Sequence, residues 1–176
     1  MIINKYPMIL MAPEVYELFG RIDPWALYPP FLEKVIAVTQ KLLDNKTKFY
    51  WTQGYRTYQE QDNLYAKGRT APGGKVTNAR GGYSAHNFCC AVDGTKDTDI
   101  SKPGLQPSWV KSHYKELADA AEAEGLEAGF YWKNFFDGPH IQLPLSKHGL
   151  SVSNLRKAHQ KGGREAVYEL LDKYKW

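Results

Sequence analysis

Apolar positions recur at helical spacing in the segment 31–45, directly after Pro29 and Pro30. A stripe of this kind along an otherwise polar segment is typical of an amphipathic helix. The pattern therefore predicts a helix that ends near Asn45. The positions that form the stripe are Phe31, Val35, Ile36, Leu42 and Leu43.

An aromatic-rich segment, 48–56, follows this helix and is typical of a strand that enters a turn at Gly54. Thr57 and Glu60 stand at the spacing of a capping box, which predicts a short helix directly after the turn. Residues 68–82 then contain five glycines and one proline. This composition predicts a long loop, and loops of that length inside compact domains are often functional.

Three later segments have strand-like patterns. Residues 85–93 are apolar enough for a buried strand, and 126–132 and 140–143 are two further strand-like pieces. Helices and strands are mixed along the chain without regular βαβ alternation. We therefore expect an α+β fold in which a small antiparallel sheet is flanked by helices, with 1–176 forming a single domain.

Two helices are predicted in the second half of the chain. Ser108 is placed to cap a helix over 109–124 that stops at Gly125. The tail, 151–176, is also predicted to be helical, and its basic residues would suit an anionic lipid surface. We favour the simpler interpretation, in which the tail packs its apolar face on the domain. The residues of that face are Val167, Leu171 and Tyr174.

The composition is that of a soluble globular domain, with 43% hydrophobic and 24% charged residues in 176. The net charge of +4 is a mild bias, weaker than a dedicated nucleic-acid-binding protein shows, so no nucleic-acid partner is expected. The chain contains 12 Tyr and 5 Trp, residue types that line carbohydrate and peptide grooves as well as cores. We expect a monomer.

The N-terminal 20 residues do not resemble a secretory signal, because the apolar run 8–12 is short and lies between two prolines. No stretch approaches the length of a membrane span, so no stable membrane insertion is expected. Cys89 and Cys90 are adjacent and cannot form an ordinary disulfide, which makes a reducing compartment the default. We therefore expect synthesis in the cytoplasm without a signal peptide.

Metal-binding residue types gather in two places. A catalytic zinc site takes three protein ligands and leaves a fourth position open. His86 and Asp93 are seven apart, and strict strand alternation would place them on opposite faces, so His86 must precede the regular strand or a bulge must intervene. A third ligand is offered by the segment 135–143, which contains His140 with Asp137 three residues before it.

The two cysteines lie between the first candidates and compete for the same role, since thiolates are good zinc ligands. Neighbouring strand residues point to opposite faces, so at most one of Cys89 and Cys90 could face His86. No second cysteine pair completes a structural site. We interpret both as small buried apolar residues.

Three segments, 54–70, 81–93 and 125–143, together resemble the zinc peptidases of the D-alanyl-D-alanine carboxypeptidase (VanY-like) superfamily. Within it, the resemblance is closest to the L-alanyl-D-glutamate endopeptidases that bacteriophages use as endolysins. It covers about 49–143, the motif-bearing core of the expected peptidase domain. The superfamily pattern SxHxxGxAxD, followed much later by DxxH, is matched by Ser84, His86, Ala91, Asp93, Asp137 and His140.

The resemblance implies a zinc ion held by His86, Asp93 and His140, with water in the open position. It also implies that Asp137 is the general base, which takes a proton from that water and passes it to the leaving amine. Arg56 matches an arginine of the superfamily that would neutralise the developing oxyanion or bind a substrate carboxylate.

Two further residues match superfamily positions that contact substrate, namely Gln61 and Ser84. Gln142 lies two residues past His140 on the same strand face, where it could support that ligand. The chain departs from the pattern at three places. Cys89 replaces the glycine of SxHxxGxAxD, Gly94 stands where an apolar residue is usual, and Ala128 stands where relatives often have tryptophan.

The resemblance implies a peptidoglycan endopeptidase that hydrolyses the L-Ala–D-Glu bond of the stem peptide and lyses the cell wall after its release from the cytoplasm. One alternative is a D-Ala-D-Ala carboxypeptidase with the same metal residues, which would normally carry an export signal or anchor. The other is a non-catalytic, metal-bearing binding module, as in hedgehog signalling domains. The presence of Asp137 and Arg56 favours an enzyme over such a module.

Overall fold

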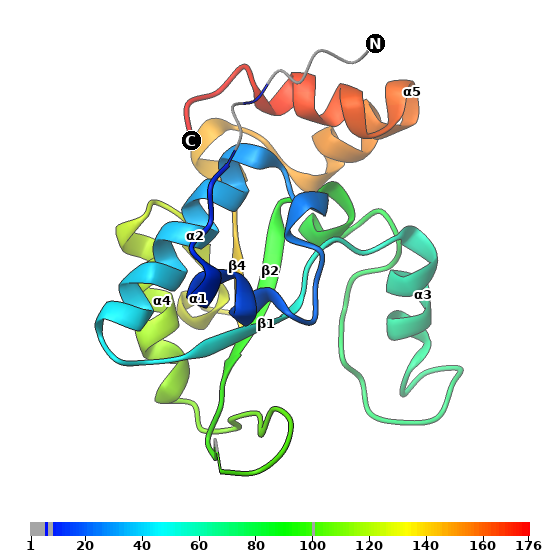
Figure 1. Cartoon of the computed structure of the whole chain (residues 1–176). Helices are drawn as coiled ribbons and strands as arrows, with labels where there is room; N and C mark the ends of the chain where they lie inside the picture. Colours follow the sequence, from blue (N-terminus) through cyan, green and yellow to red (C-terminus); the bar gives the residue numbers. More distant parts are fainter. Residues whose placement is uncertain (1–5, 7–8, 100) are drawn as a thin grey trace.

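A four-stranded antiparallel sheet with the order β1-β2-β4-β3 lies at the centre of the molecule (Figure 1). The computed structural model describes residues 6, 9–99 and 101–176. The strands are β1 Phe49–Gln53, β2 Ala91–Lys96, β3 Glu127–Ala128 and β4 His140–Gln142. The expected α+β class with a small antiparallel sheet is therefore confirmed.

Helices surround this sheet. α2 packs against α4, and α3 stands apart from both with the long loop that follows it (Figure 1). The helices are α1 Pro13–Tyr16, α2 Pro29–Asp44, α3 Tyr58–Ala66, α4 His113–Ala123 and α5 Val152–Leu171. Short 3-10 helices join them: η1 Glu17–Phe19, η2 Pro24–Ala26, η3 Ala85–Phe88, η4 Gly129–Tyr131 and η5 Leu145–His148.

The largest fully buried side chain, Trp51 of β1, ties the sheet to α2. Its indole Nε1 donates a hydrogen bond of 2.9 Å to Oγ1 of Thr39. The ring lies over Gly94 on the neighbouring strand, where a Cβ would come within 3.0 Å of two ring carbons. Glycine at position 94, one of the departures from the superfamily pattern, thus makes room for Trp51.

The local signals of the first half of the chain are confirmed. α2 covers almost the whole predicted segment and ends beside Asn45. α3 begins with the expected capping box, in which Oγ1 of Thr57 accepts from the amide of Glu60 and the Glu60 carboxylate accepts from the amide of Thr57. The reciprocal bonds satisfy two amides that a helix start would otherwise leave unpaired.

The predicted strand over 85–93 is wrong in its first half. The chain there forms η3, and only from β2 onward is it extended. Cys89 has a positive φ of 63°, which interrupts an extended backbone. Asn87 also fixes the turn, since its side chain accepts from the amide of Gly82 and donates to the carbonyl of Arg56.

Two other boundaries also differ from the sequence-based expectation. The helix expected from Ser108 begins only at His113, because Ser108 continues the contact with β2 through a 3.0 Å bond from its amide to the Lys96 carbonyl. The strand expected over 126–132 is shortened to β3. Gly129 then lies so close to another backbone segment that a Cβ would be 2.5 Å from the carbonyl oxygen of Asp137.

The tail is helical and packs on the domain, as favoured from the sequence. Val167 and Leu171 of α5 are buried in the main core, and α5 contacts η3. The helix is interrupted at Gly162 and Gly163, whose dihedral angles are not helical. Within the described part of the chain, no helix combines the length and the apolar character needed to cross a bilayer.

Candidate metal centre

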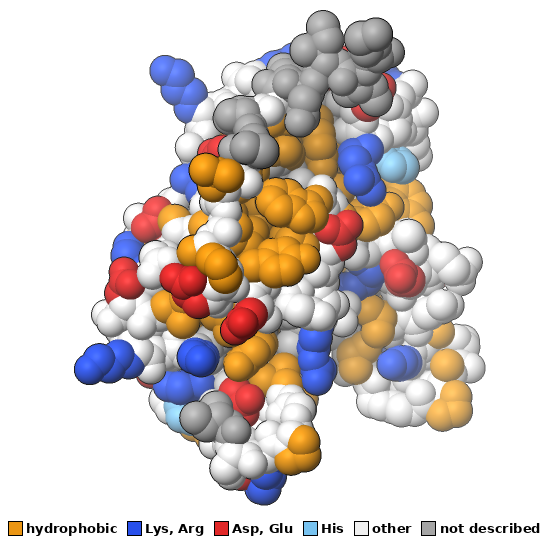
Figure 2. Space-filling model, viewed as in Figure 1, with side chains coloured by type: hydrophobic (Ala, Val, Ile, Leu, Met, Phe, Trp, Pro, Cys, Tyr) orange, Lys and Arg blue, Asp and Glu red, His pale blue; other side chains and the backbone are white. Residues whose placement is uncertain are grey.

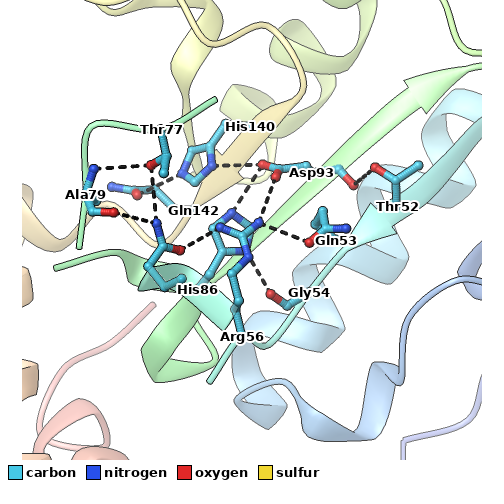
Figure 3. A network of polar contacts seen from close by, with 11 residues as sticks. Thr52, Gln53, Gly54, Arg56, Thr77, Ala79, His86, Asp93, His140 and Gln142 are labelled. Atoms are coloured by element: carbon cyan, nitrogen blue, oxygen red, sulfur yellow. Dashed lines mark hydrogen bonds and ion pairs between the residues drawn. The ribbon is translucent and has the colours of Figure 1, made fainter. Parts of the chain in front are cut away.

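His86, Asp93 and His140 come together although they belong to three different elements, η3, β2 and β4. One possible ligand atom from each lies within 4.8 Å of the other two (Figure 3). Asp93 and His140 are paired directly across the antiparallel strands β2 and β4. His86 precedes the regular strand, which is one of the two arrangements that the seven-residue spacing allowed.

A backbone carbonyl orients the His86 ring. Nδ1 of His86 lies 2.8 Å from the carbonyl oxygen of Gly54, which can only accept, so this nitrogen carries the proton of the neutral ring. Nε2 is then left with a lone pair, and it lies 3.2 Å from Oδ1 of Asp93. A histidine held in this way presents one defined nitrogen to a metal.

His140 is oriented from its other side. Its Nε2 lies 3.0 Å from Oε1 of Gln142, and its Nδ1 lies 3.0 Å from Oδ1 of Asp93. Trp132 packs on the ring with a centroid distance of 5.1 Å and is itself held by a 2.6 Å hydrogen bond from Nε1 to Glu127. Gln142 thus makes the supporting contact expected from its place on the strand.

Charges in this cluster favour the ionised carboxylate. Burial alone would raise the pKa of Asp93, but the two neighbouring imidazoles outweigh this and hold that pKa well below its ordinary value. Burial likewise opposes a charge on His140, yet the Asp93 carboxylate raises the pKa of His140. A carboxylate that attracts protons onto adjacent imidazoles will also attract a metal cation in their place.

The donor set fits a divalent metal. It consists of two imidazole nitrogens and one carboxylate oxygen, the kind of three-ligand set that catalytic zinc takes. The second ring nitrogen of each histidine is engaged by an oxygen acceptor. Cys89 and Cys90 are 1% and 0% exposed and are not part of the cluster.

Arg56 lies beside the cluster and is held by several partners. Its Nη1 donates a 2.7 Å bond to Gln61, its Nη2 donates a 3.2 Å bond to Gln53, and Nη2 lies 3.6 Å from Oδ2 of Asp93 (Figure 3). Burial lowers the pKa of Arg56, although Asp93 opposes that shift. Its Nε is buried and has no hydrogen-bond partner among the described residues.

Gln61 is 0% exposed and reaches the site through its neighbours. Its Oε1 accepts from Arg56, and its Nε2 donates to the carbonyl of Ala79 at 2.8 Å and to Oγ1 of Thr77 at 3.2 Å. It therefore joins α3 to the long loop behind the guanidinium. Substrate contact by Gln61 stays a prediction.

Asp137 and Ser84 line the same cleft as the metal cluster. Burial raises the pKa of Asp137 above its ordinary value, while His140 acts in the opposite direction. The backbone of Asp137 is fixed, because its amide donates to Gly129 and its carbonyl accepts from the amide of His140. These two backbone bonds, to Gly129 and from His140, hold Asp137 in place at the cleft that it lines.

The cleft itself has a volume of about 850 Å³. Its floor is the metal cluster, and its walls come from the long loop after α3 and from the segments before and after α4. Aromatic side chains are prominent along the walls: Tyr83, Trp109, Trp132 and Phe135.

Several of these contacts had no signal in the sequence. The bond from His86 to Gly54 uses a backbone carbonyl, which every residue type has, so the sequence gives no sign of it. The bond from Trp132 to Glu127 joins two residues that were both expected within one strand, 126–132, where they would not contact each other in this way. Position 89, where the superfamily pattern has glycine, has a positive φ in this structure, although the residue here is Cys89. Glycine adopts such a φ without strain, which explains the pattern.

Comparison with known proteins gives a consistent result. The family model described as VanY: D-alanyl-D-alanine carboxypeptidase matches residues 27–137. The peptidoglycan L-alanyl-D-glutamate endopeptidase CwlK of Bacillus subtilis (strain 168) is 40% identical over 99 residues. That alignment covers 52% of this chain, and the chain spans only 58% of the length of this curated relative.

Two solved structures share the fold. The crystal structure of the Serratia marcescens L-Ala D-Glu endopeptidase ChiX superposes with a TM-score of 0.53 at 23% identity, covering 82% of this chain and 97% of that one. The structure of the LdcB LD-carboxypeptidase gives a TM-score of 0.50 at 18% identity, covering 74% and 75%. At these identities the two structures establish the architecture alone.

Proposed function

The chain belongs to the VanY family of D-alanyl-D-alanine carboxypeptidases, and on that basis we propose that it is a zinc-dependent peptidoglycan endopeptidase that hydrolyses the L-Ala–D-Glu bond of the stem peptide. The observation that carries the proposal is the cluster of His86, Asp93 and His140 on the floor of a cleft that also contains Asp137 and Arg56. A hydrolase needs these groups in one place, because water must be activated and the developing charge stabilised at the same carbonyl.

The choice of bond rests on sequence similarity. The relative that is 40% identical bears the name L-alanyl-D-glutamate endopeptidase, whereas the family description names a D-alanyl-D-alanine carboxypeptidase. In both substrates the scissile bond precedes a D-residue with a carboxylate beside the amide nitrogen, so one set of residues can serve either reaction. Products distinguish them, since the carboxypeptidase releases free D-Ala and the endopeptidase leaves a new amino terminus on D-Glu.

His86, Asp93 and His140 would hold the metal, through Nε2 of the first, a carboxylate oxygen of the second and Nδ1 of the third. We propose zinc because two imidazoles and one carboxylate, with room for one further ligand, are typical of catalytic zinc. A zinc ion bound there would supply Lewis acidity toward the scissile carbonyl and the attacking water. Gly54 and Gln142 keep the two rings in the required orientation.

Asp137 is proposed as the general base. Its carboxylate takes a proton from the attacking water as the new C–O bond forms, and gives that proton to the amine of D-Glu as the C–N bond breaks. The raised pKa of Asp137, which follows from its burial, brings its basicity closer to neutral pH. The products are a carboxylate on L-Ala and a free amine on D-Glu, so one water is consumed for each bond cleaved.

Arg56 is proposed to bind substrate and to stabilise negative charge on the reacting carbonyl oxygen. Its guanidinium is fixed by Gln61 and Gln53, so it need not reorganise during the reaction. Arg56 also lines the cleft beside the metal cluster, which supports a role in binding. Ser84, which also lines the cleft, is proposed to contact the peptide.

The biological setting is the finer part of the proposal. We propose a monomeric endolysin of phage type, made in the cytoplasm and released to the wall at the end of infection. The resemblance of the three motif segments supports this setting. Expression in a bacterial cytoplasm should leave cells intact until a membrane-permeabilising protein is induced, after which they should lyse.

Mass spectrometry of digested peptidoglycan tests the reaction directly. Purified wall material incubated with the zinc-loaded protein should yield peptide fragments that begin with D-Glu and glycan strands whose lactyl groups carry only L-Ala. Free D-Ala as the only product would establish the carboxypeptidase instead. An absence of any product from several wall chemistries, with zinc bound, would establish the non-catalytic binding module.

A further inference from the structure

Two aromatic side chains on the wall of the cleft are exposed to solvent. Trp109 is 87% exposed and Phe135 is 47% exposed, and both line the same cleft as the metal cluster. An exposed tryptophan is a large apolar surface that folding alone does not favour. Its place beside a proposed catalytic site therefore indicates a ligand contact.

These two rings differ from the aromatic side chains around them. Phe130 makes edge-to-face contacts with both Tyr131 and Phe136, and Lys111 Nζ lies 4.4 Å from the ring centroid of Phe136. Trp109 and Phe135, in contrast, contact no other ring and no cation among the described residues. Lys111 joins the segment of Trp109 to the segment of Phe135, and both unpartnered rings line the cleft.

The base of Trp109 is fixed although its ring is free. The preceding residue, Ser108, is 1% exposed and donates its amide to the carbonyl of Lys96 on β2 at 3.0 Å. The hydroxyl of Ser108 lies 2.8 Å from Nδ1 of His113, and its carbonyl accepts a 2.6 Å bond from the hydroxyl of Tyr114. The position of the residue that carries the ring is therefore fixed, so only the side-chain torsions of Trp109 have to be ordered when a ligand covers the ring.

The chemistry of the substrate determines what would meet this wall. In peptidoglycan, the L-Ala of the stem peptide is joined to the lactyl group of N-acetylmuramic acid, so a sugar lies within two residue lengths, roughly 7 Å, of the scissile carbonyl. The cleft of about 850 Å³ is at the upper end of the range for a drug-sized ligand and exceeds what a dipeptide fills. Part of it is therefore available for the sugar.

We propose that Trp109 and Phe135 form a glycan subsite that stacks on the N-acetylated sugars of the strand to which the stem peptide is attached. The face of an aromatic ring carries partial negative charge and attracts the polarised C–H bonds of a sugar face. This inference rests on the proposed L-Ala–D-Glu endopeptidase activity and adds a second part of the substrate to it. The subsite selects polymeric or disaccharide-bearing substrate over free stem peptide.

Two synthetic substrates test the subsite: the free stem peptide, and the same peptide carried by an N-acetylglucosaminyl-N-acetylmuramic acid disaccharide. The wild-type protein should cleave the disaccharide-bearing peptide with a kcat/KM about tenfold higher, because a contact with the face of an aromatic ring is of that order. Trp109→Ala should bring the two values of kcat/KM together, mainly through KM for the disaccharide substrate. Phe135→Ala should reduce the preference partly.

Trp25→Ala is a matched control. Trp25 is also exposed, at 55%, but does not line the cleft. Hydrophobic side chains are visible at the surface over the N-terminal elements α1 and α2 in Figure 2, so exposure of aromatic residues is not confined to the cleft. This variant should keep the wild-type preference.

Equal kcat/KM values for the two substrates in the wild type would overturn the subsite while leaving the endopeptidase intact. A Trp109→Ala variant that loses activity on both substrates in the same proportion would also overturn it, as would a Trp109-dependent dimer in sedimentation or Trp109-dependent binding to anionic vesicles. Cleavage of neither substrate would instead reject the proposed function. In that case, titration calorimetry measures the affinity of the wild type and of Trp109→Ala for the disaccharide-bearing peptide. The subsite predicts weaker binding to the variant, and equal affinities would overturn it.

Discussion

Arg56 and Gln61 form a buried pair in which Nη1 of the arginine donates a 2.7 Å hydrogen bond to Oε1 of the glutamine. Arg56 is 8% exposed and Gln61 is 0% exposed. The glutamine is anchored by its own bond to the carbonyl of Ala79, so its carbonyl oxygen cannot turn away from the guanidinium. Among the described residues, Arg56 is the only arginine or lysine that lines the cleft. The buried amide of Gln61 thus determines the direction in which the Arg56 guanidinium points.

Replacement of Gln61 by methionine should lower both stability and activity. Methionine has a similar length but no polar atoms, so Arg56 and Ala79 each lose a buried partner, at a cost of about 1–3 kcal/mol for each group. Unfolding in urea and kcat/KM measure the two effects, and the zinc content should not change. Gln59→Met, on the exposed side of the same helix, is the control and should stay within about 0.5 kcal/mol of wild type. Similar behaviour of the two variants would contradict a positioning role for Gln61.

Removal of either histidine of the cluster should abolish metal binding. His86→Ala or His140→Ala leaves two protein ligands of the three that catalytic zinc takes, and we expect less than about one tenth of the zinc content of wild type after dialysis. Loss even of a residue that supports a ligand lowers metal affinity about 10- to 100-fold. Chelation of the wild type should stop wall lysis, and zinc should restore it. The double variant Cys89→Ser, Cys90→Ala should keep its zinc. Loss of zinc from a folded form of that double variant would mean that the wrong ligands have been assigned.

Asp137→Asn should separate catalysis from metal binding. Asparagine has nearly the same shape but cannot take a proton from water, so turnover should fall by roughly a hundredfold or more. The zinc content and KM should change little, because Asp137 acts on the water and not on the substrate's affinity. Asp44→Asn, at the end of α2, is a control of the same chemistry outside the cleft. Turnover close to wild type in zinc-loaded Asp137→Asn would exclude this base.

The metal-free protein should lose stability as the pH rises above about 6.5 and through the raised pKa of His140. Burial favours neutral His140, but Asp93 outweighs it and raises the pKa of His140, so the folded state binds this proton more tightly than the unfolded chain does. The resulting stabilisation is complete below the unfolded pKa of about 6.5 and is lost as the pH rises through the raised value. Asp93 contributes at the acid end, since its lowered pKa gives stability that is lost only as the pH falls through that value.

Zinc should reverse this dependence on pH, because protons and metal compete for the same imidazole nitrogens. The increase in unfolding temperature caused by zinc should therefore become larger as the pH rises through the raised pKa of His140. Thermal unfolding with chelator or with zinc measures both trends. A metal-free protein that becomes more stable over this range would show that the contact of His140 with Asp93 does not hold the extra proton.

Cys89→Gly should be more stable than Cys89→Ala by about 1 kcal/mol, although it removes one more carbon atom. A side chain at a positive φ costs roughly 1–2 kcal/mol, and glycine relieves this cost. At an ordinary buried position the order would be the opposite, since glycine removes a methyl group and adds unfolded-state entropy. Urea unfolding of the two variants gives the order directly. A more stable alanine variant would show that the turn after η3 is not strained.

Local patterns were sufficient where a short segment decides its own structure. The capping box of Thr57 and Glu60 fixed the start of α3, and the alternation rule left two arrangements for His86, a place before the strand of Asp93 or a bulge, of which the first is found. The pattern failed at 85–93, because the residues are apolar enough for a strand while Cys89 adopts a positive φ that glycine usually takes. Composition alone does not indicate that conformation for cysteine.

Long-range contacts were beyond the sequence for a different reason. The role of Gln61 as the anchor of Arg56 depends on the loop carbonyl of Ala79, and the exposure of Trp109 depends on the fixed base at Ser108. Both are set by how separate segments pack, and a single sequence does not contain that information. The resemblance to the superfamily indicated which residues lie together at the site, and the structure shows the contacts that position them.

The contact between His86 and Gly54 bears on how this site can drift during evolution. Every residue type has a carbonyl oxygen, so no change of codon at position 54 removes the acceptor itself. The limit is one of space, since a Cβ at position 54 would lie 3.2 Å from Cδ1 of Ile22. A smaller residue at position 22 would lift that limit. Related proteins could then differ at both positions 22 and 54 and keep the same orientation of the His86 ring. An alignment would show neither position as conserved, although the contact is retained.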